Sequence, residues 1–138
     1  MKVFRLATIA AAMLAVASVA SATDSPKDAK VYFISPQDGA TVSSPFKVQF
    51  GLSGMGVAPA GAEHENTGHH HLIIDAPLPP LDQPIVNDDN HKHFGAGQTE
   101  TMVTLPPGKH TLQLLLADFQ HVPHNPPVYS KQITITVK

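Results

Sequence analysis

Proline is the residue that most restricts how this chain can fold. The thirteen prolines are spread from residue 26 to residue 127 and, together with the glycines, divide this region into short apolar runs. A proline inside a helix removes a backbone hydrogen bond and clashes with the preceding turn. No helix can therefore run through 76–90, which contains four prolines. The distribution favours short strands joined by turns and loops.

The apolar runs alternate as strands with one buried face do. In Phe46–Leu52, for example, Phe46, Val48 and Phe50 fall on one face, and Lys47 and Gln49 on the other. We expect strands at 31–34, 46–52, 69–75, 99–105, 110–118 and 128–137. Their number and spacing predict an all-β fold, an immunoglobulin-like antiparallel β-sandwich of about six to seven strands. A jelly roll or a small barrel is the alternative architecture.

The first 22 residues have the pattern of a secretory signal peptide. Lys2 and Arg5 precede an apolar run from Leu6 to Val19, and Ala20-Ser21-Ala22 matches a small-residue cleavage pattern. An uncleaved membrane anchor is the alternative, but the run is shorter than the ~20 residues that span a bilayer. The expected organisation is a cleaved signal peptide at 1–22, a flexible lead-in at 23–30 and one β-sandwich domain at 31–138.

Composition narrows the compartment and the partners. An exported chain without cysteine is typical of the bacterial periplasm or the cell surface, so we expect a periplasmic or secreted protein with no membrane span after signal cleavage. Cleavage lowers the nine basic residues to seven, all lysines, against eleven acids, which gives a formal net charge of −4. Such a chain has no basic patch for phosphates, so nucleic acid is not an expected partner. The expected partners are a metal cation and, with it, another periplasmic or membrane protein that handles metals.

Seven of the nine histidines fall into three clusters, which are His69-His70-His71, His91 with His93, and His121 with His124. Side chains alternate along a strand, so His69 and His71 share one face. Neutral imidazole is the commonest metal ligand among protein side chains, and strand ends and loops gather at the ends of a sandwich. We therefore predict that His69, His71, His93 and His121 hold one metal ion, with His110, His91 and His124 as further candidate ligands. The alternative is that the histidines are solvated or bonded to the backbone.

Other residues near the clusters have candidate supporting roles. Gly95 and Gly97 follow the second cluster and allow a close backbone approach. Gln98 and Glu100 are candidates to orient a ligand histidine, although outward strand positions explain them equally well. Met55 offers a thioether to Cu(I), but a lone methionine is usually a packing residue.

The ligand type indicates the metal. Imidazole without thiolate suits Cu, Zn, Ni and Fe, and the order of divalent affinities favours Cu(II) at an accessible histidine site. We expect copper, with zinc as the alternative.

Four segments of the chain resemble the secreted domain-of-unknown-function family 4399 (DUF4399). They are GHHHLIID at 68–75, HKHFGAGQTE at 91–100, LPPGKHTLQLLLADFQHVPH at 105–124 and SKQITITV at 130–137. The resemblance extends from about Phe46 to the end of the chain. It implies an exported β-domain of undefined activity, and it places His69, His71, His93, His110 and His121 at motif positions.

Three functions fit these patterns. The first is a periplasmic metal-binding protein that uses a histidine-rich site at one end of the sandwich for copper storage, delivery or tolerance. The second is a non-catalytic cell-envelope interaction module whose histidines are structural. The third is a metal-dependent enzyme with three protein ligands and one open position, in which Glu100 or Asp75 would be the base. Catalysis is less favoured, because no nucleophile motif specifies a reaction.

Overall fold

The structure is a computed structural model that describes Ala15 and residues 21–138. Most of the predicted signal peptide lies outside the described residues. The strands are β1 (Lys30–Ser35), β2 (Thr41–Val42), β3 (Phe46–Ser53), β4 (Gly56–Val57), β5 (Thr67–Ile74), β6 (His91–His93), β7 (Glu100–Val103), β8 (Gly108–Ala117) and β9 (Ile133–Val137). No helix occurs in this described part of the chain. Within it, accordingly, no helix has the length and apolar character needed to cross a membrane.

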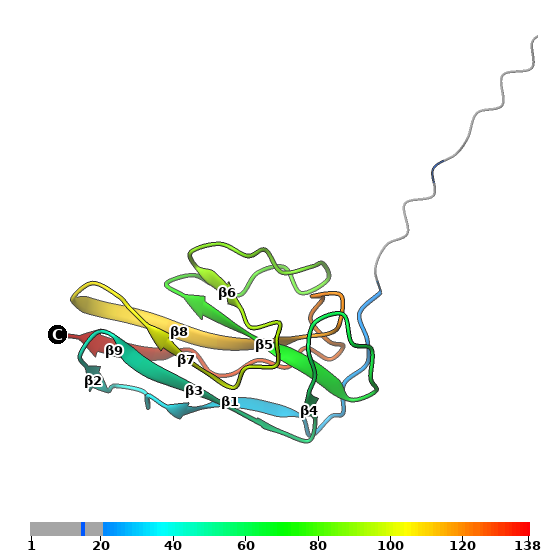
Figure 1. Cartoon of the computed structure of the whole chain (residues 1–138), viewed down its shortest axis with the longest axis horizontal. Coiled ribbons are helices and arrows are strands. Elements are labelled where there is room, and N and C mark those ends of the chain that lie inside the picture. The colour runs from blue at the N-terminus through cyan, green and yellow to red at the C-terminus, as the bar shows by residue number, and fades with distance from the viewer. Residues whose placement is uncertain (1–14, 16–20) are drawn as a thin grey trace, which may run out of the picture.

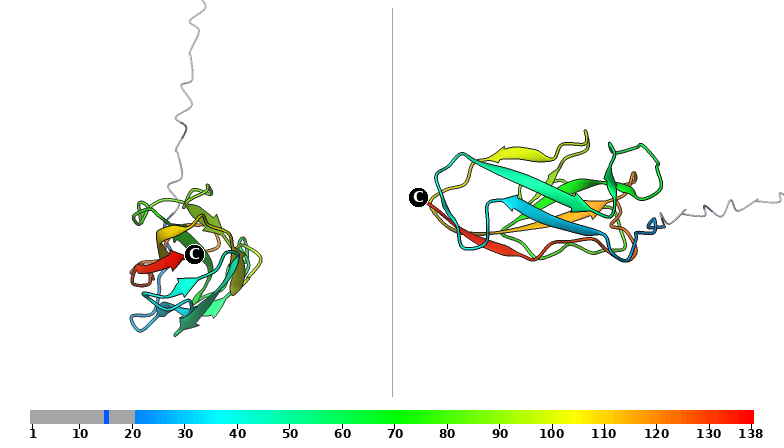
Figure 2. Two further views of the ribbon diagram at one scale, coloured as in Figure 1. Left: turned by 90° about the vertical axis from the view of Figure 1, so that its left-hand side faces the viewer. Right: turned by 90° about the horizontal axis from the view of Figure 1, so that it is seen from below.

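The strands form two sheets that pack face to face (Figure 1). The smaller sheet has the order β1-β3-β7, and the larger one has the order β2-β9-β8-β5-β4, with β6 also paired to β5. Six strands have four residues or more, so the predicted all-β sandwich is confirmed. The immunoglobulin-like arrangement within that class stays a prediction. In Figure 2 the described N-terminal segment and the C-terminus lie at opposite ends of the long axis.

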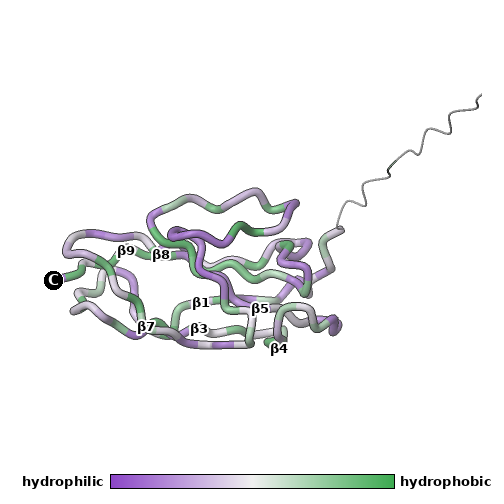
Figure 3. Tube along the Cα trace, turned by 45° about the horizontal axis from the view of Figure 1, so that its top comes forward, coloured by the Kyte–Doolittle hydropathy of each residue, from purple (hydrophilic) through white to green (hydrophobic). Residues whose placement is uncertain are grey.

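The central strands β5 and β8 of the larger sheet are largely buried on both faces. Leu112, Leu114 and Leu116 of β8 pack in the main core between the sheets, where Val48 and Phe50 of β3 meet them. On the outer face a second apolar cluster covers the same strands and contains Ile73, Ile85, Leu115 and Ala117. Ile85 belongs to the proline-rich connection at 76–90, which therefore forms a partial third layer over β5 and β8. Figure 3 shows hydrophobic and hydrophilic stretches intermixed along the chain of the sandwich.

The structure also contains features that the sequence patterns did not predict. The two-residue strands β2 and β4 are too short to carry a periodic pattern. Strand β6 covers His91–His93, which was expected to be part of a loop, and it forms by pairing with β5. Strand β9 begins at Ile133, later than expected, because the chain at 128–130 pairs irregularly with β8 through Leu116 N to Val128 O and Ser130 N to Leu114 O.

Candidate metal centre

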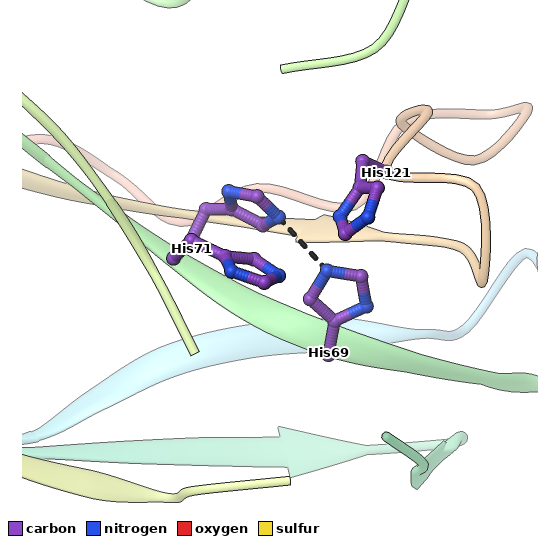
Figure 4. Close-up of side chains that lie close together, drawn as sticks. His69, His71 and His121 are labelled. Carbon is purple, nitrogen blue, oxygen red and sulfur yellow. Dashed lines mark hydrogen bonds between the residues drawn. The ribbon is translucent and has the colours of Figure 1, made fainter. Parts of the chain in front are cut away.

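Four histidines meet on the outer face of the larger sheet, toward the end of the sandwich where β8 finishes. His69 and His71 project from this face of β5, as the predicted alternation requires. His93 lies on β6 directly opposite His71 in the antiparallel register. His121 follows β8 in a tight turn. Figure 4 shows His69 and His71, both from β5, and His121, from the turn after β8, pointing toward one another.

The ring nitrogens of His69, His71, His93 and His121 are close enough to share an ion. Each ring offers one nitrogen, and the four nitrogens lie within 4.8 Å of one another. The Nε2 atoms of His69 and His71 are 3.1 Å apart, so that one Nε2–H donates to the other nitrogen. Imidazole nitrogens bound tetrahedrally to zinc at ~2.0–2.1 Å would be about 3.3 Å apart. The two most distant ring nitrogens would therefore have to move roughly 1.5 Å closer together for all four to bind one ion.

Burial keeps the rings of His69, His71 and His93 neutral. Burial, together with the neighbouring histidines, lowers the pKa of His71 to about 2. Burial, with the nearby His93 and His121, lowers the pKa of His69 to about 4. The pKa of His93 is also lowered, first by burial and then by His121. Neutral rings leave a nitrogen lone pair free for a metal, because a ligand histidine must be unprotonated.

Unpartnered nitrogens remain in the same cluster. His69 Nδ1, His71 Nδ1 and His93 Nε2 are buried without a hydrogen-bond partner. Buried polar atoms normally find partners, since burial without one costs free energy. Together with His121, these three imidazoles form an all-nitrogen donor set that fits a transition metal.

Gly95 makes room for the His93 ring. A Cβ built on Gly95 would overlap Cε1 of His93 and approach its Nε2 closely. The close approach predicted for this glycine is therefore made by the side chain of His93. Replacing Gly95 would displace the ring.

His121 has a strained backbone that the turn around it maintains. Its φ is 67°, in the left-handed region that is uncommon for residues other than glycine. Its N–H donates to the carbonyl oxygen of Asp118 at 2.9 Å, and the Asp118 N–H donates to the carbonyl oxygen of Val122 at 2.9 Å. Oδ1 of Asp118 accepts the N–H groups of Gln120 and Val122 at 2.9 and 3.0 Å. No sequence pattern singled out Asp118 as a site residue, although a short acidic side chain at the start of a turn is a recognisable signal.

A pocket opens from the cluster toward the proline-rich connection. It has a volume of about 270 Å³ and is lined by His71, His93, His121, Ile85 and Asn87. The Ile85 N–H donates to the carbonyl oxygen of His121 at 2.9 Å, which ties the connection to the site. Ile85 and Asn87 are site residues that no motif in the sequence indicated.

The other three candidate ligands lie outside this cluster. His91 Nδ1 is 2.8 Å from Oδ1 of the exposed Asp88. His124 donates through Nε2 to the carbonyl oxygen of Thr67 at 3.0 Å. His110 lies at the other end of β8, with Nδ1 2.6 Å from Oδ2 of Asp75 and Nε2 2.8 Å from the carbonyl oxygen of Pro106.

The residues considered for supporting roles are also engaged elsewhere. Met55 packs against the main core. The Gln98 side chain accepts the N–H of Ala96, and Glu100 contacts Lys47 and Gln49 on the exposed face of the smaller sheet. Asp75, the other candidate base, holds His110 and the N–H of Thr111.

The His110–Asp75 pair predicts a stability difference that depends on pH. The hydrogen bonds to Asp75 and Pro106 raise the pKa of His110, so its stabilising contribution is fully present below the unfolded pKa of ~6.5 and is lost as pH rises through the folded pKa. We expect His110→Gln to destabilise the protein by less than about 1 kcal/mol at pH 5.5, since the pair is close to the surface. Urea unfolding should show a smaller difference at pH 8.5, and a difference that grows with pH would contradict this assignment.

Comparison with known proteins supports the resemblance noted in the sequence. No curated protein matches the chain. One solved structure, the endo-beta-1,4-mannanase from Thermotoga petrophila, aligns with 17% identity and a TM-score of 0.46, over 81% of this chain but only 20% of that one. The family model for "Domain of unknown function (DUF4399)" matches residues 48–138. That range is more than half of the chain and contains all four clustered histidines, and the protein therefore belongs to the DUF4399 family.

Proposed function

We propose that this protein is a periplasmic metal-binding protein whose cargo is copper, held for storage, delivery or tolerance. The observation that carries the proposal is the convergence of His69, His71, His93 and His121, whose ring nitrogens lie within 4.8 Å of one another. These residues come from three separate stretches of chain. Solvation of separate surface histidines does not explain why these four side chains converge.

The donor set supports copper over other cargo. All four donors are imidazole nitrogens, which suit Cu(II) and Zn(II), and the affinity order of divalent ions places Cu(II) above Zn(II). Met55, the candidate thioether, packs against the main core, and the four donors of the described cluster are all imidazole nitrogens, which favours Cu(II) over Cu(I). Zinc is the alternative cargo.

The surroundings of the cluster favour binding over catalysis. The carboxylates that were candidate bases, on Asp75 and Glu100, are engaged with other partners. Two of the four rings are fully buried, which suits retention of an ion. The export pattern at 1–22 supports the periplasmic location.

Titration calorimetry of the purified protein with Cu(II) and Zn(II) tests the proposal. We expect one saturable site per chain, with Cu(II) bound more tightly, and nitrogen hyperfine structure in the electron paramagnetic resonance spectrum of the Cu(II) form. The double variant His71→Ala, His93→Ala should weaken binding more than about 100-fold, since even loss of outer partners of a metal ligand costs ~10–100-fold.

His91→Ala is the matched control, because His91 shares β6 with His93 but lies outside the cluster. This variant should keep the wild-type affinity. Absence of saturable binding in the wild type, or equal binding by the double variant, would refute the proposed function.

A further inference from the structure

A second pocket borders His69 and has a marked acidic character. Its volume is about 320 Å³, and its lining includes the carboxylate residues Asp24, Glu63, Glu65 and Asp118. Among the described residues that line it there is no lysine or arginine. Four carboxylates around one pocket favour a positive charge within it.

Thr23 lines this pocket and is held firmly in the fold. Its backbone nitrogen donates to Oδ2 of Asp118 at 3.2 Å. Its carbonyl oxygen accepts the N–H of Asn125 at 2.9 Å, and the N–H of Ser25 donates to the carbonyl oxygen of Asn125 at 3.0 Å. The segment expected to be a flexible lead-in is thus bonded to the chain at its first residue.

Asp118 joins Thr23 to the metal centre. The side chain is 1% exposed, and its two oxygens have separate partners. Oδ1 accepts the N–H groups of Gln120 and Val122, which flank the ligand His121. Oδ2 faces the backbone nitrogen of Thr23. One carboxylate therefore contacts both Thr23 and the turn that carries His121.

The predicted cleavage site lies immediately before Thr23, after Ala20-Ser21-Ala22. Hydrolysis of the Ala22–Thr23 amide by a signal peptidase consumes one water. It leaves a carboxylate on Ala22 and an amine on Thr23, which takes up a proton from solvent at neutral pH. The neutral amide N–H that faces Asp118 then becomes an ammonium group with three donors.

We propose that the α-ammonium group of Thr23, released by signal cleavage, is the ion-pair partner of Asp118, and that Asp118 held in this way is a positioning residue for the metal ligand His121. A charge-assisted hydrogen bond is about twice as strong as a neutral one. The export step would thus complete the support of the metal site. The part that concerns metal affinity rests on the proposed function, whereas the ion pair itself does not.

The test uses exported protein with two alternative N-termini. One form has the natural sequence; in the other, two glycines are inserted between Ala22 and Thr23, which moves the ammonium group away from Asp118. Each form is also made with Asp118→Asn, which keeps the Oδ1 acceptor but removes the charge. Mass spectrometry gives the N-terminus, and the thermal midpoint without metal and the dissociation constant for Cu(II) are measured for all four proteins.

We expect the natural mature chain to begin at Thr23. The glycine insertion should lower the thermal midpoint by about 4 °C and weaken Cu(II) binding about tenfold. In the Asp118→Asn background the insertion should change neither quantity. His110→Gln, at the other end of β8, is the control for general destabilisation, and it should lower the midpoint without changing the dissociation constant.

The outcomes separate the two proposals. A different mature N-terminus, or an insertion effect that is equal with and without Asp118, would overturn the ion pair. A midpoint effect without an affinity effect would overturn the positioning role of Asp118. If the natural protein binds no Cu(II), the proposed function fails, while the midpoints of the four proteins still decide the ion pair. If Asp118→Asn does not fold, the two proteins with Asp118 still test the proposal. An insertion that changes neither the midpoint nor Cu(II) binding overturns it, and a lowered midpoint together with weaker Cu(II) binding supports it.

Discussion

Replacing His70 with leucine is expected to stabilise the metal-free protein and to reduce its loss of stability in acid. His70 lies on the face of β5 opposite to His69 and His71, and its ring packs 5.0 Å from the ring of Phe50 in the core. Neither of its ring nitrogens has a hydrogen-bond partner. A buried unsatisfied polar group costs about 1–3 kcal/mol, and leucine fills a similar volume without that cost.

The acid dependence follows from the sign of the pKa shifts. Burial lowers the pKa of His70 to about 4, and the pKa values of His69 and His71 are lowered to about 4 and about 2. In the unfolded chain these rings take up protons near pH ~6.5. Their contribution to stability is therefore fully present above pH ~6.5 and is lost as pH falls toward the folded pKa values. Between its folded and unfolded pKa values, each ring adds about 1.4 kcal/mol per pH unit to the slope of the free energy of unfolding against pH.

Urea unfolding of metal-free protein between pH 7 and pH 4.5 measures this slope. His70→Leu should remove about one third of the part that these three rings contribute, and it should raise the free energy of unfolding by about 1–3 kcal/mol at pH 7. His70→Gln is the matched control, because glutamine does not titrate but is still a buried polar side chain. It should flatten the slope without the gain at pH 7. An unchanged slope in both variants would contradict the assignment.

Metal binding is expected to raise thermal stability by on the order of 10 °C. The cluster is assembled only in the folded state, so an ion that occupies it stabilises that state by mass action. At free metal concentrations of 100 to 1,000 times the dissociation constant, the gain is about 2.7–4.1 kcal/mol. For a domain of this size that gain corresponds to a rise of roughly 10 °C in the melting temperature.

Differential scanning calorimetry with Cu(II), with Zn(II) and after addition of a chelator measures this effect. The chelator should return the melting temperature to the metal-free value. The double variant His71→Ala, His93→Ala should show little rise, and His91→Ala should show the full rise. Equal rises in both variants would place the bound ion outside the cluster.

Periodicity in the sequence was sufficient to predict the faces of the long strands. The alternation in β5 separates His69 and His71 from His70, and the structure places them on opposite faces of the sheet. The alternation in β8 likewise separates Leu112, Leu114 and Leu116 from Leu115 and Ala117. Long strands contain enough residues for a period of two to be recognised.

Contacts between distant segments could not be derived in this way. His93 is placed by β6, a strand of only three residues that forms because β5 offers it a partner. His121 depends on a turn whose geometry comes from one buried carboxylate. Ile85, which lines the pocket beside the cluster, belongs to the proline-rich connection at 76–90, and this segment has no periodic hydrophobic pattern. In each case the decisive interaction is tertiary, and local sequence does not encode it.

The four candidate ligands come from three stretches of chain, and this origin has a consequence for when a metal ion could bind. A polypeptide threaded through a translocation channel in extended form keeps β5, β6 and the turn after β8 far apart, and the ion then has no cage to occupy. If the protein is exported by that route, each molecule reaches its destination without a bound ion, and the compartment in which it folds decides which ion it meets first.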